Sequence, residues 1–358
     1  MITDGSGNGA GPTPLLDVRE LSVFLPAPDG REVQILDEVT FSVDRGTTLG
    51  LIGESGSGKS MTALAILRLL PAGARVEGQV LLDGVDLLSQ PLTAMKSVRG
   101  RRISIVFQEP MTALDPVFTI GYQISQTLRA HREFSRRAAR EAGIEMLTAV
   151  GIPDPSRRYD EYPHQLSGGM RQRAMIAMAL ICQPELLIAD EPTTAVDITI
   201  QAQLLALLRD LNLTRETAIL FVSHDIGVIA EMCRDVVVMY AGQVVESCST
   251  DDLLERPRHP YSSGLMWAVP RIGSHADELF AIPGRVPLPG SLPDGCSFHP
   301  RCGHVQPSCI EHPQSLDPVV GQLHHRVRCH RSSQLDLPGV LDEHPVSLIG
   351  GDHVRSSS

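Results

Sequence analysis

The stretch Gly53-Glu54-Ser55-Gly56-Ser57-Gly58-Lys59-Ser60 decides the fold of this chain. It fits the pattern G-x-x-x-x-G-K-[ST], in which glycines let successive backbone N–H groups wrap around phosphate groups. Residues 47–52 before it read as a buried strand, and residues 61–70 after it read as an apolar helix whose N-terminal dipole faces an anion. We therefore expect the segment from Gly53 to Met61 to bind a nucleoside triphosphate. Lys59 would reach the outer phosphates, and the Ser60 hydroxyl would hold Mg²⁺.

Two further apolar strands end in residues suited to hydrolysis. Residues 186–189 form a buried-strand pattern that ends in Asp190 and Glu191, and residues 218–223 form another that ends in His224. Asp190 can join Ser60 in holding Mg²⁺. Glu191 can orient and deprotonate the attacking water, and His224 can contact and polarise the terminal phosphate. The plainer alternatives are an edge strand closed by two solvated carboxylates and a structural histidine.

A third string, Leu166-Ser167-Gly168-Gly169-Met170, precedes a predicted helix over residues 170–181. Its free N–H groups and the positive end of the helix dipole would point outward, where they could meet an anion. Ser167 is also a good helix N-cap residue after a turn, and the two interpretations hold together.

Composition limits the class of protein. The 358 residues are 42% hydrophobic but only 4% aromatic, which suits an α/β core filled by Leu, Val and Ala. No apolar run approaches the ~18 residues needed to span a bilayer, and residues 1–14 are a polar, Gly-rich lead rather than a signal peptide. We expect a soluble cytosolic protein whose membrane role, if any, comes through a partner. The net charge of −11 argues against a nucleic-acid surface.

The strings divide the chain into regions. Residues 15–255 predict an α/β fold, a phosphate-loop ATPase with a parallel doubly wound core. Within this range, helical patterns such as residues 136–150 predict a helical subdomain at about 92–180. Prolines, histidines and cysteines crowd residues 256–330 and predict a separate, small Cys-rich C-terminal domain. We expect residues 1–14 and 331–358 to be disordered tails.

The seven cysteines form two groups. Cys182, Cys233 and Cys248 lie singly in apolar segments and read as inert, buried thiols. The other four lie in a 34-residue, loop-rich stretch with spacing C-x5-C-x6-C-x19-C: Cys296, Cys302, Cys309 and Cys329. This spacing lacks the paired knuckles of a zinc ribbon and suits an iron–sulfur cluster held by four thiolates. Zinc and unmetallated thiols remain alternatives, because six histidines could substitute as ligands: His299, His304, His312, His324, His325 and His330.

The order of the phosphate loop, Gln108, the string at 166–170, the strand end at 190–191 and His224 resembles the ATP-binding subunits of ABC transporters. The resemblance implies that two such domains sandwich two ATP molecules head to tail, each phosphate loop facing the partner's 166–170 signature. It also implies that Gln108 senses Mg²⁺, that Asp197 lies at the dimer seam and that His224 contacts the γ-phosphate. A second ATPase subunit, either a copy or a paralogue, is therefore expected.

Four longer segments narrow the resemblance. Residues 107–116, 162–165, 258–261 and a tail with Ile282-Pro283-Gly284 and Gly295-Cys296-Ser297-Phe298-His299-Pro300-Arg301-Cys302 are similar to the oligopeptide/dipeptide permease ATPase subfamily, over roughly residues 15–331. This implies an ATP- and Mg²⁺-dependent subunit of a peptide importer. It would lie on the cytoplasmic face of the cell membrane with two permease subunits and a solute-binding protein.

The resemblance further implies a [4Fe–4S] cluster, which members with these four cysteines can carry. Two alternatives to a peptide importer remain. One is an importer of nickel or another small solute, whose ATPases are very similar, and the other is a soluble ABC-type ATPase acting on DNA or ribosomes.

The sequence departs from the family at the adenine site. In the family an aromatic residue stacks on adenine in a pattern like Leu-Ser-Val-x-aromatic, whereas Phe24 here is one residue early. On a strand that shift points the ring to the opposite face. Phe24 could still reach the base through a bulge, or the base could rest on Leu25 and Val33. Phe24 could equally be a core residue.

Overall fold

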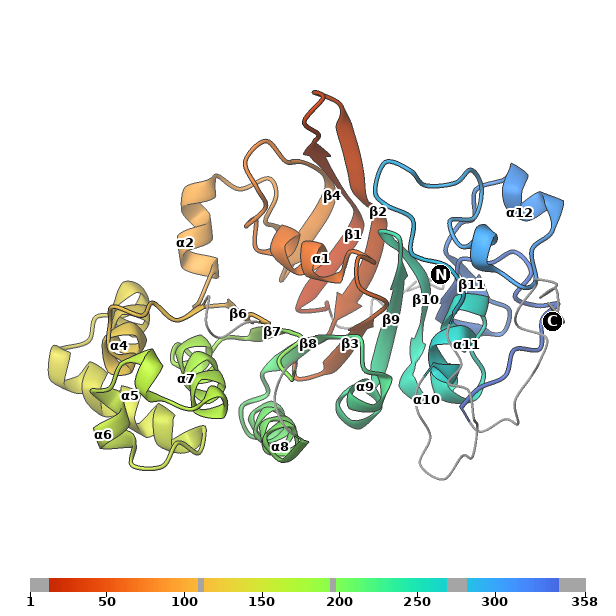
Figure 1. Cartoon of the computed structure of the whole chain (residues 1–358). Coiled ribbons are helices and arrows are strands. Elements are labelled where there is room, and N and C mark those ends of the chain that lie inside the picture. The colour runs from red at the N-terminus through yellow and green to blue at the C-terminus, as the bar shows by residue number, and fades with distance from the viewer. Residues whose placement is uncertain (1–12, 109–112, 194–197, 269–281, 341–358) are drawn as a thin grey trace, which may run out of the picture.

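The structure, a computed structural model, describes residues 13–108, 113–193, 198–268 and 282–340. Its strands form a four-stranded sheet in the order β2-β1-β4-β5 and an eight-stranded sheet in the order β11-β12-β10-β9-β3-β8-β7-β6 (Figure 1). The strand bounds are β1 Leu16–Pro26, β2 Glu32–Val43, β3 Thr48–Ile52, β4 Arg75–Leu82, β5 Val85–Asp86, β6 Ile103–Val106, β7 Leu186–Asp190, β8 Ala218–Ser223, β9 Asp235–Tyr240, β10 Gln243–Ser249, β11 Asp317–Val319 and β12 Gln322–Val327.

The described helices lie in three groups. Those packed on the main sheet are α1 Lys59–Ile66, α8 Ile198–Arg215 and α9 Ile226–Met232. Those of the helical region are η1 Leu92–Ala94, α2 Met95–Val98, α4 Ile120–His131, α5 Arg136–Ala149, α6 Pro155–Tyr159, η2 Pro163–Gln165 and α7 Gly168–Leu180. Those towards the C-terminus are α10 Thr250–Glu255, α11 Pro260–Trp267, η3 His299–Arg301 and α12 Pro307–Glu311. Among the described residues, no helix is both long and apolar enough to cross a membrane.

The main sheet is mixed. Strands β6, β7, β8, β3 and β9 run parallel, as the sequence predicts, but β10, β12 and β11 join them antiparallel. The predicted parallel core is therefore confirmed for these five strands, but the sheet as a whole is mixed. The reason is that residues after β9 return by a tight hairpin at Ala241 and Gly242, which gives an antiparallel neighbour without a crossover helix.

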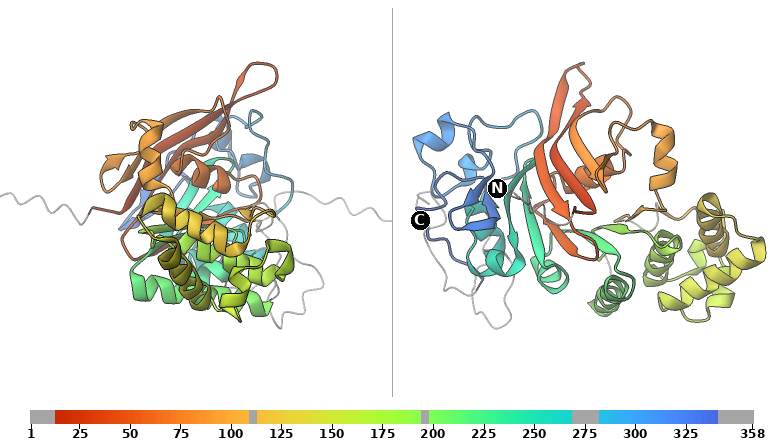
Figure 2. Two further views of the ribbon diagram at one scale, coloured as in Figure 1. Left: turned by 90° about the vertical axis from the view of Figure 1, so that its left-hand side faces the viewer. Right: turned by 180° about the vertical axis from the view of Figure 1, so that it is seen from behind.

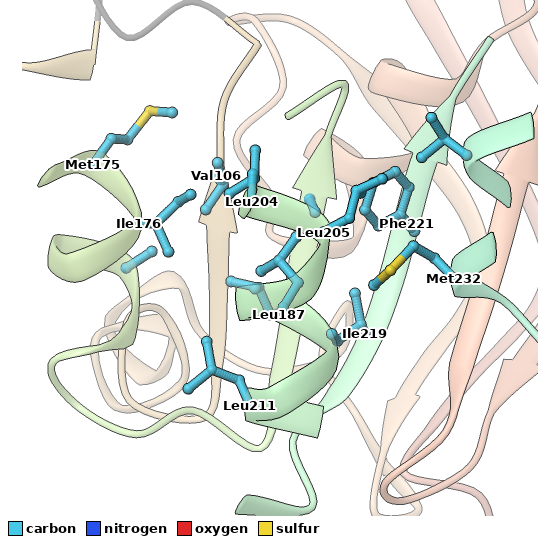
Figure 3. Close-up of a cluster of buried hydrophobic side chains, with 14 of the residues drawn as sticks. Val106, Met175, Ile176, Leu187, Leu204, Leu205, Leu211, Ile219, Phe221 and Met232 are labelled. Atoms are coloured by element: carbon cyan, nitrogen blue, oxygen red, sulfur yellow. The ribbon is translucent and has the colours of Figure 1, made fainter. Parts of the chain in front are cut away.

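The two faces of the main sheet bury different partners. Leu187 of β7 packs with α7, α8 and α9 on one face, where Figure 3 shows it beside Ile219 and Phe221 and next to α8. Leu186 and Ile188, one residue away on either side, pack on the other face with α1 and the four-stranded sheet. Successive residues of a strand point to opposite faces, so the continuous apolar run 186–189 serves both cores. Helices alone therefore do not cover the second face, as a doubly wound fold would require.

Helix ends follow local capping chemistry. Ser135 caps α5, and its side chain accepts from the N–H of Ala138 over 3.1 Å. The predicted helix 136–150 matches α5 to within one residue. In contrast, α1 begins at Lys59 and ends at Ile66, because Leu67 is its C-cap and Arg68 has a left-handed φ of 53°. The helix predicted over residues 61–70 was therefore placed too late.

The helical subdomain and the C-terminal region lie at opposite ends of the main sheet (Figures 1 and 2). Within the predicted helical range 92–180, strand β6 belongs to the edge of the main sheet. The C-terminal region is not set apart, since β12 pairs with β10 and continues the same sheet. Residues 331–340 differ from the expected disordered tail: Leu337 packs on Trp267, and the Val340 N–H donates to the Leu254 carbonyl over 2.7 Å. Residues 1–12 and 341–358 lie outside the described residues.

Candidate active site

The phosphate loop lies where the sequence predicts it, between the end of β3 and the start of α1. Gly58 is the N-cap of α1 with a left-handed φ of 106°, and a Cβ there would lie 2.7 Å from Leu36 Cδ2. A Cβ on Gly53 would come 2.3 Å from the Met239 carbonyl oxygen. Glycine is thus required at Gly53 because the main chain of β9 leaves no room for a Cβ, and it is favoured at Gly58 by the left-handed backbone.

Lys59 is held inside the loop. Its Nζ donates to the Gly53 carbonyl over 2.8 Å and to the Glu54 carbonyl over 3.1 Å. Burial lowers the pKa of the Lys59 ammonium from its usual range, although the nearby carboxylates of Glu191, Asp190 and Glu54 oppose that shift. A triphosphate in the loop would supply the negative charge that a buried ammonium favours.

Ser60 and Asp190 form a pair suited to Mg²⁺. The Ser60 hydroxyl donates to Asp190 Oδ1 over 3.1 Å, and Asp190 is buried at the carboxyl end of β7. Burial raises the pKa of the Asp190 carboxyl, and the neighbouring Glu191 adds to this. Hydroxyl and carboxylate oxygens are the ligands that Mg²⁺ prefers, and its charge would offset the cost of burying Asp190 in its ionised form. The two residues therefore fit the ion.

Glu191 lines the nucleotide cleft and contacts two other predicted site residues. Gln108 Nε2 donates to its Oε2 over 3.0 Å, and His224 Nδ1 lies 3.2 Å from its Oε1. Its backbone has a left-handed φ of 47°, and its N–H donates to the Val222 carbonyl over 2.9 Å. This conformation at the end of β7 turns the carboxylate towards the cleft that the phosphate loop also lines. The structure thus brings together the predicted residues of the loop, Gln108, Glu191 and His224.

The 166–170 string lies elsewhere. Ser167 is the N-cap of α7 and accepts from the Met170 N–H over 3.3 Å, so α7 begins two residues before the predicted helix. Leu166 is buried, whereas Ser167 and Gly168 are exposed. Among the described residues that line the phosphate-loop cleft, none comes from this string. Asp197 lies outside the described residues.

The C-terminal region closes one side of the cleft. The lining residues from this region are Leu265 of α11, its C-cap Ala268, and Gly284, Arg285, Val286 and Pro289. Sequence reasoning missed these residues, although Ile282-Pro283-Gly284 was among the segments that carried the resemblance. They make the C-terminal region part of the candidate active site.

Phe24 is placed away from the cleft. The Arg75 guanidinium carbon lies 3.8 Å from the centre of its half-buried ring. Neither Phe24 nor Leu25 nor Val33 is among the described lining residues of the cleft, whereas Ile35 is. The cation–π contact with Arg75 explains the position of Phe24 without a nucleotide.

The four C-terminal cysteines converge on one small cavity. Cys296, Cys302, Cys309 and Cys329 all line it, and all four are free thiols. Burial raises the pKa of Cys302 to about 11 and that of Cys329 to about 12, and the neighbouring thiols add to both shifts. Thiols in this state become thiolate ligands only when a bound cation offsets the cost.

The cavity offers histidines as well as thiols to a metal. Among the described residues, no three of these thiols lie within 4.8 Å of one another, as the ligands of a single ion would. Of the six candidate histidines, His299, His304 and His330 line the cavity. His312 and His324 are exposed, and His325 Nε2 instead lies 2.7 Å from Glu246 Oε1. Cys182, Cys233 and Cys248 are buried, as expected.

Comparison with known proteins agrees with this geometry. The family model described as ABC transporter matches residues 36–194, and that described as oligopeptide/dipeptide transporter, C-terminal region, matches residues 245–309. A peptide import ATP-binding protein of Brucella melitensis is 48% identical over 90% of this chain and 98% of its own length. The oligopeptide transport ATP-binding protein OppD of Haemophilus influenzae is 45% identical over 87% of this chain and 96% of its own length.

Solved structures show the same fold. An ATP-binding cassette determined as a dimer in a post-hydrolysis state with ADP and Pi gives a TM-score of 0.59 at 25% identity, over 66% of this chain and 98% of that chain. The cbiO1 protein of Clostridium perfringens, part of an ABC transporter complex, gives 0.56 at 25% identity, over 67% of this chain and 90% of that chain. The two matching family models, together with relatives 45–48% identical over nearly their whole length, place the chain among the ABC ATPases, in the oligopeptide/dipeptide transporter family.

Proposed function

We propose that this chain hydrolyses ATP to drive the import of peptides through an ABC transporter. The observation that carries the proposal is the cleft in which the phosphate loop, Gln108, Glu191 and His224 meet. It lies in a chain that covers nearly the full length of relatives named for peptide import. An importer of nickel or another small solute is the alternative, because the solute is selected by other subunits.

The residues of the cleft divide the work of hydrolysis. Loop N–H groups and Lys59 bind the phosphates and neutralise their charge, while Ser60 and Asp190 hold Mg²⁺, which supplies further charge neutralisation when bound. Glu191 takes a proton from the attacking water. The oxygen of that water bonds to the γ-phosphorus while the bond between the γ-phosphorus and the bridging oxygen of ADP breaks. Gln108 and His224 contact both oxygens of Glu191 and so fix its orientation.

The partners follow from the same proposal. The 166–170 signature lies outside its own cleft, which supports a second ATPase subunit, a copy or a paralogue, whose signature would complete the site. Asp197 would lie at the seam between the two. Two membrane permease subunits and a solute-binding protein would complete the importer, with this chain bound peripherally at the cytoplasmic face. Nucleic acid is not expected as a partner, since the net charge is −11.

Reconstituted transport tests the function. The full-length chain would be assembled with its permease subunits and second ATPase in vesicles, and uptake of labelled di- and oligopeptides and of Ni²⁺ would be measured with and without ATP. ATP-dependent peptide uptake supports the proposal. Uptake of Ni²⁺ alone would replace peptide with metal as the solute, and ATP hydrolysis that no permease stimulates would favour a non-transport ATPase.

We also propose that Cys296, Cys302, Cys309 and Cys329 bind a [4Fe–4S] cluster that joins the loops of the C-terminal region. The single cavity that all four cysteines line supports this assignment, and zinc is the alternative. Full-length protein purified without oxygen would be analysed for iron, sulfide and zinc. About four irons per chain are expected from four-thiolate ligation. Stoichiometric zinc without iron would overturn the cluster.

A further inference from the structure

The Arg301 side chain joins the cysteine-bearing loop to the phosphate loop. Its Nη1 donates to Glu54 Oε2 over 2.7 Å, and its Nη2 donates to Glu54 Oε1 over 3.0 Å. Glu54 is the second residue of the phosphate loop and lies 247 residues earlier in the chain. Two parallel bonds to one carboxylate form the strongest and most directional arrangement available to arginine.

Arg301 is buried and its donors are committed. Its side chain is only 4% exposed, and the guanidinium carbon lies 5.7 Å from the ring centre of Tyr240. Its Nε donates to the Pro283 carbonyl over 2.8 Å, and Nη2 also reaches the Ile282 carbonyl over 3.2 Å. The same side chain therefore holds both the phosphate loop and the start of the 284–289 segment that lines the nucleotide cleft.

Glu54 connects this contact to Lys59. The Glu54 N–H donates to the Tyr261 hydroxyl over 2.8 Å, and its carbonyl accepts from Lys59 Nζ over 3.1 Å. A carboxylate at this position would repel a triphosphate if its charge were left uncompensated. Arg301 supplies the compensating charge from the C-terminal region.

The backbone ties Arg301 to the cavity thiols. Arg301 is the last residue of the short helical turn η3, and Cys296 and Cys302 lie on either side of this turn. The His299 N–H donates to the Cys296 carbonyl over 2.9 Å, and the Cys302 N–H donates to the His299 carbonyl over 3.2 Å. A shift of the main chain at Cys296 or Cys302 would therefore be passed on to Arg301.

We propose that Arg301 is a positioning residue for the nucleotide, which neutralises and holds Glu54 and thereby couples ATP binding to the state of the cysteine-lined cavity. The inference rests on the ATP-binding activity of the family and not on the solute or on which metal the cavity takes. Coupling is reciprocal, so ATP must in turn change the environment of Cys296 and Cys302.

The first test measures ATP affinity in the full-length chain. R301M should bind a fluorescent ATP analogue about tenfold more weakly, within the usual range of coupling between sites. The double variant R301M/E54Q should regain most of that affinity, since it no longer strands a carboxylate beside the phosphates.

A matched arginine provides the control. Arg328 is buried, as Arg301 is, and donates instead to the carbonyls of Val244 and Gln314. R328M should therefore keep the affinity of the unaltered chain. Unchanged affinity in R301M, an equal loss in R328M, or no recovery in the double variant would each overturn the positioning role.

The second test measures thiol reactivity in metal-free, reduced, full-length protein, desalted before Mg-ATP is added. Iodoacetamide labelling of Cys296 and Cys302, followed by mass spectrometry with Cys182 as reference, should slow about fivefold with ATP, within the range expected of coupled sites. R301M should show no such slowing at an ATP concentration that saturates it.

Equal labelling with and without ATP in the unaltered chain would overturn the coupling. Failure of the unaltered chain to bind ATP would overturn the ATP site itself, whereas a wrong solute assignment would leave both tests unaffected.

Discussion

The phosphate loop and the cysteine-lined cavity are assembled in opposite ways. The loop consists of eight consecutive residues fixed between β3 and α1, so its shape is set by regular elements on either side. The cavity collects thiols from residues 296–329, carried largely by turns and short helices. The loop is therefore organised before its ligand arrives, whereas we expect the loops around the cavity to depend on the proposed cluster. Removing the nucleotide should therefore leave the structure of the phosphate loop intact, whereas removing the proposed cluster should loosen the loops around the cavity.

The largest effect is expected at Glu191. E191Q keeps the shape of the side chain but cannot accept a proton, so turnover in the assembled transporter should fall about 100-fold or more while ATP binding is kept. Phosphate release and binding of a fluorescent ATP analogue would be measured side by side. E231Q, at an exposed ion pair with Arg209, is the control and should leave both unchanged. Turnover of E191Q close to that of the unaltered chain would show that another group takes the proton.

Loss of one cavity thiol should separate the two regions. C302S should remove one ligand of the proposed cluster, so anaerobically purified protein should lose the colour that the cluster gives it. Its melting temperature should fall by roughly 5 °C or more, because the cluster no longer joins the loops. C182S removes a buried thiol outside the cavity and should keep both colour and iron content. Iron analysis and thermal unfolding provide the measurements. Full iron content in C302S would remove this residue from the proposed ligands.

The core of the main sheet, on which the phosphate loop is built, should contribute strongly to the free energy of unfolding. L187A removes a buried side chain beneath β7 and should lower the free energy of unfolding by about 2–5 kcal/mol. Denaturant titration of L187A against L288A, where Leu288 is 74% exposed, would measure the difference. A loss below about 1 kcal/mol would indicate that the core at this position repacks without a cavity.

A helix cap outside both regions sets the baseline. S135A removes the N-cap bond to Ala138 and should cost about 1 kcal/mol of stability, with ATP affinity and iron content unchanged. S97A, which loses a bond within the short helix α2 region rather than a cap, is the comparison. If S135A altered ATP affinity, stability alone would account for part of the effects predicted above.

The sequence predicted the elements whose signals are local. The loop motif with its flanking strand, the apolar runs at 186–189 and 218–223, and the helical pattern at 136–150 each occupy one short segment, and all are found where expected. The contacts it missed join distant segments: β12 on β10, the 284–289 segment in the cleft, and Arg301 on Glu54. Such pairings leave no periodic pattern in one sequence. The contact of Phe24 with Arg75 on β4 is another such pairing, and the sequence left the position of Phe24 open.

The segment at 284–289 has a consequence for chemical selectivity. Arg285, Val286 and Pro289 give the cleft a wall that an ATP-binding cassette without this C-terminal region would lack. A competitive ligand that reaches past the phosphates towards this wall would meet both a cation and apolar surface. Groups of the ligand that do not touch the phosphate loop would then make its affinity for this chain differ from its affinity for a cassette without the C-terminal region. The region that distinguishes this family thus also offers a handle for inhibitors directed at it.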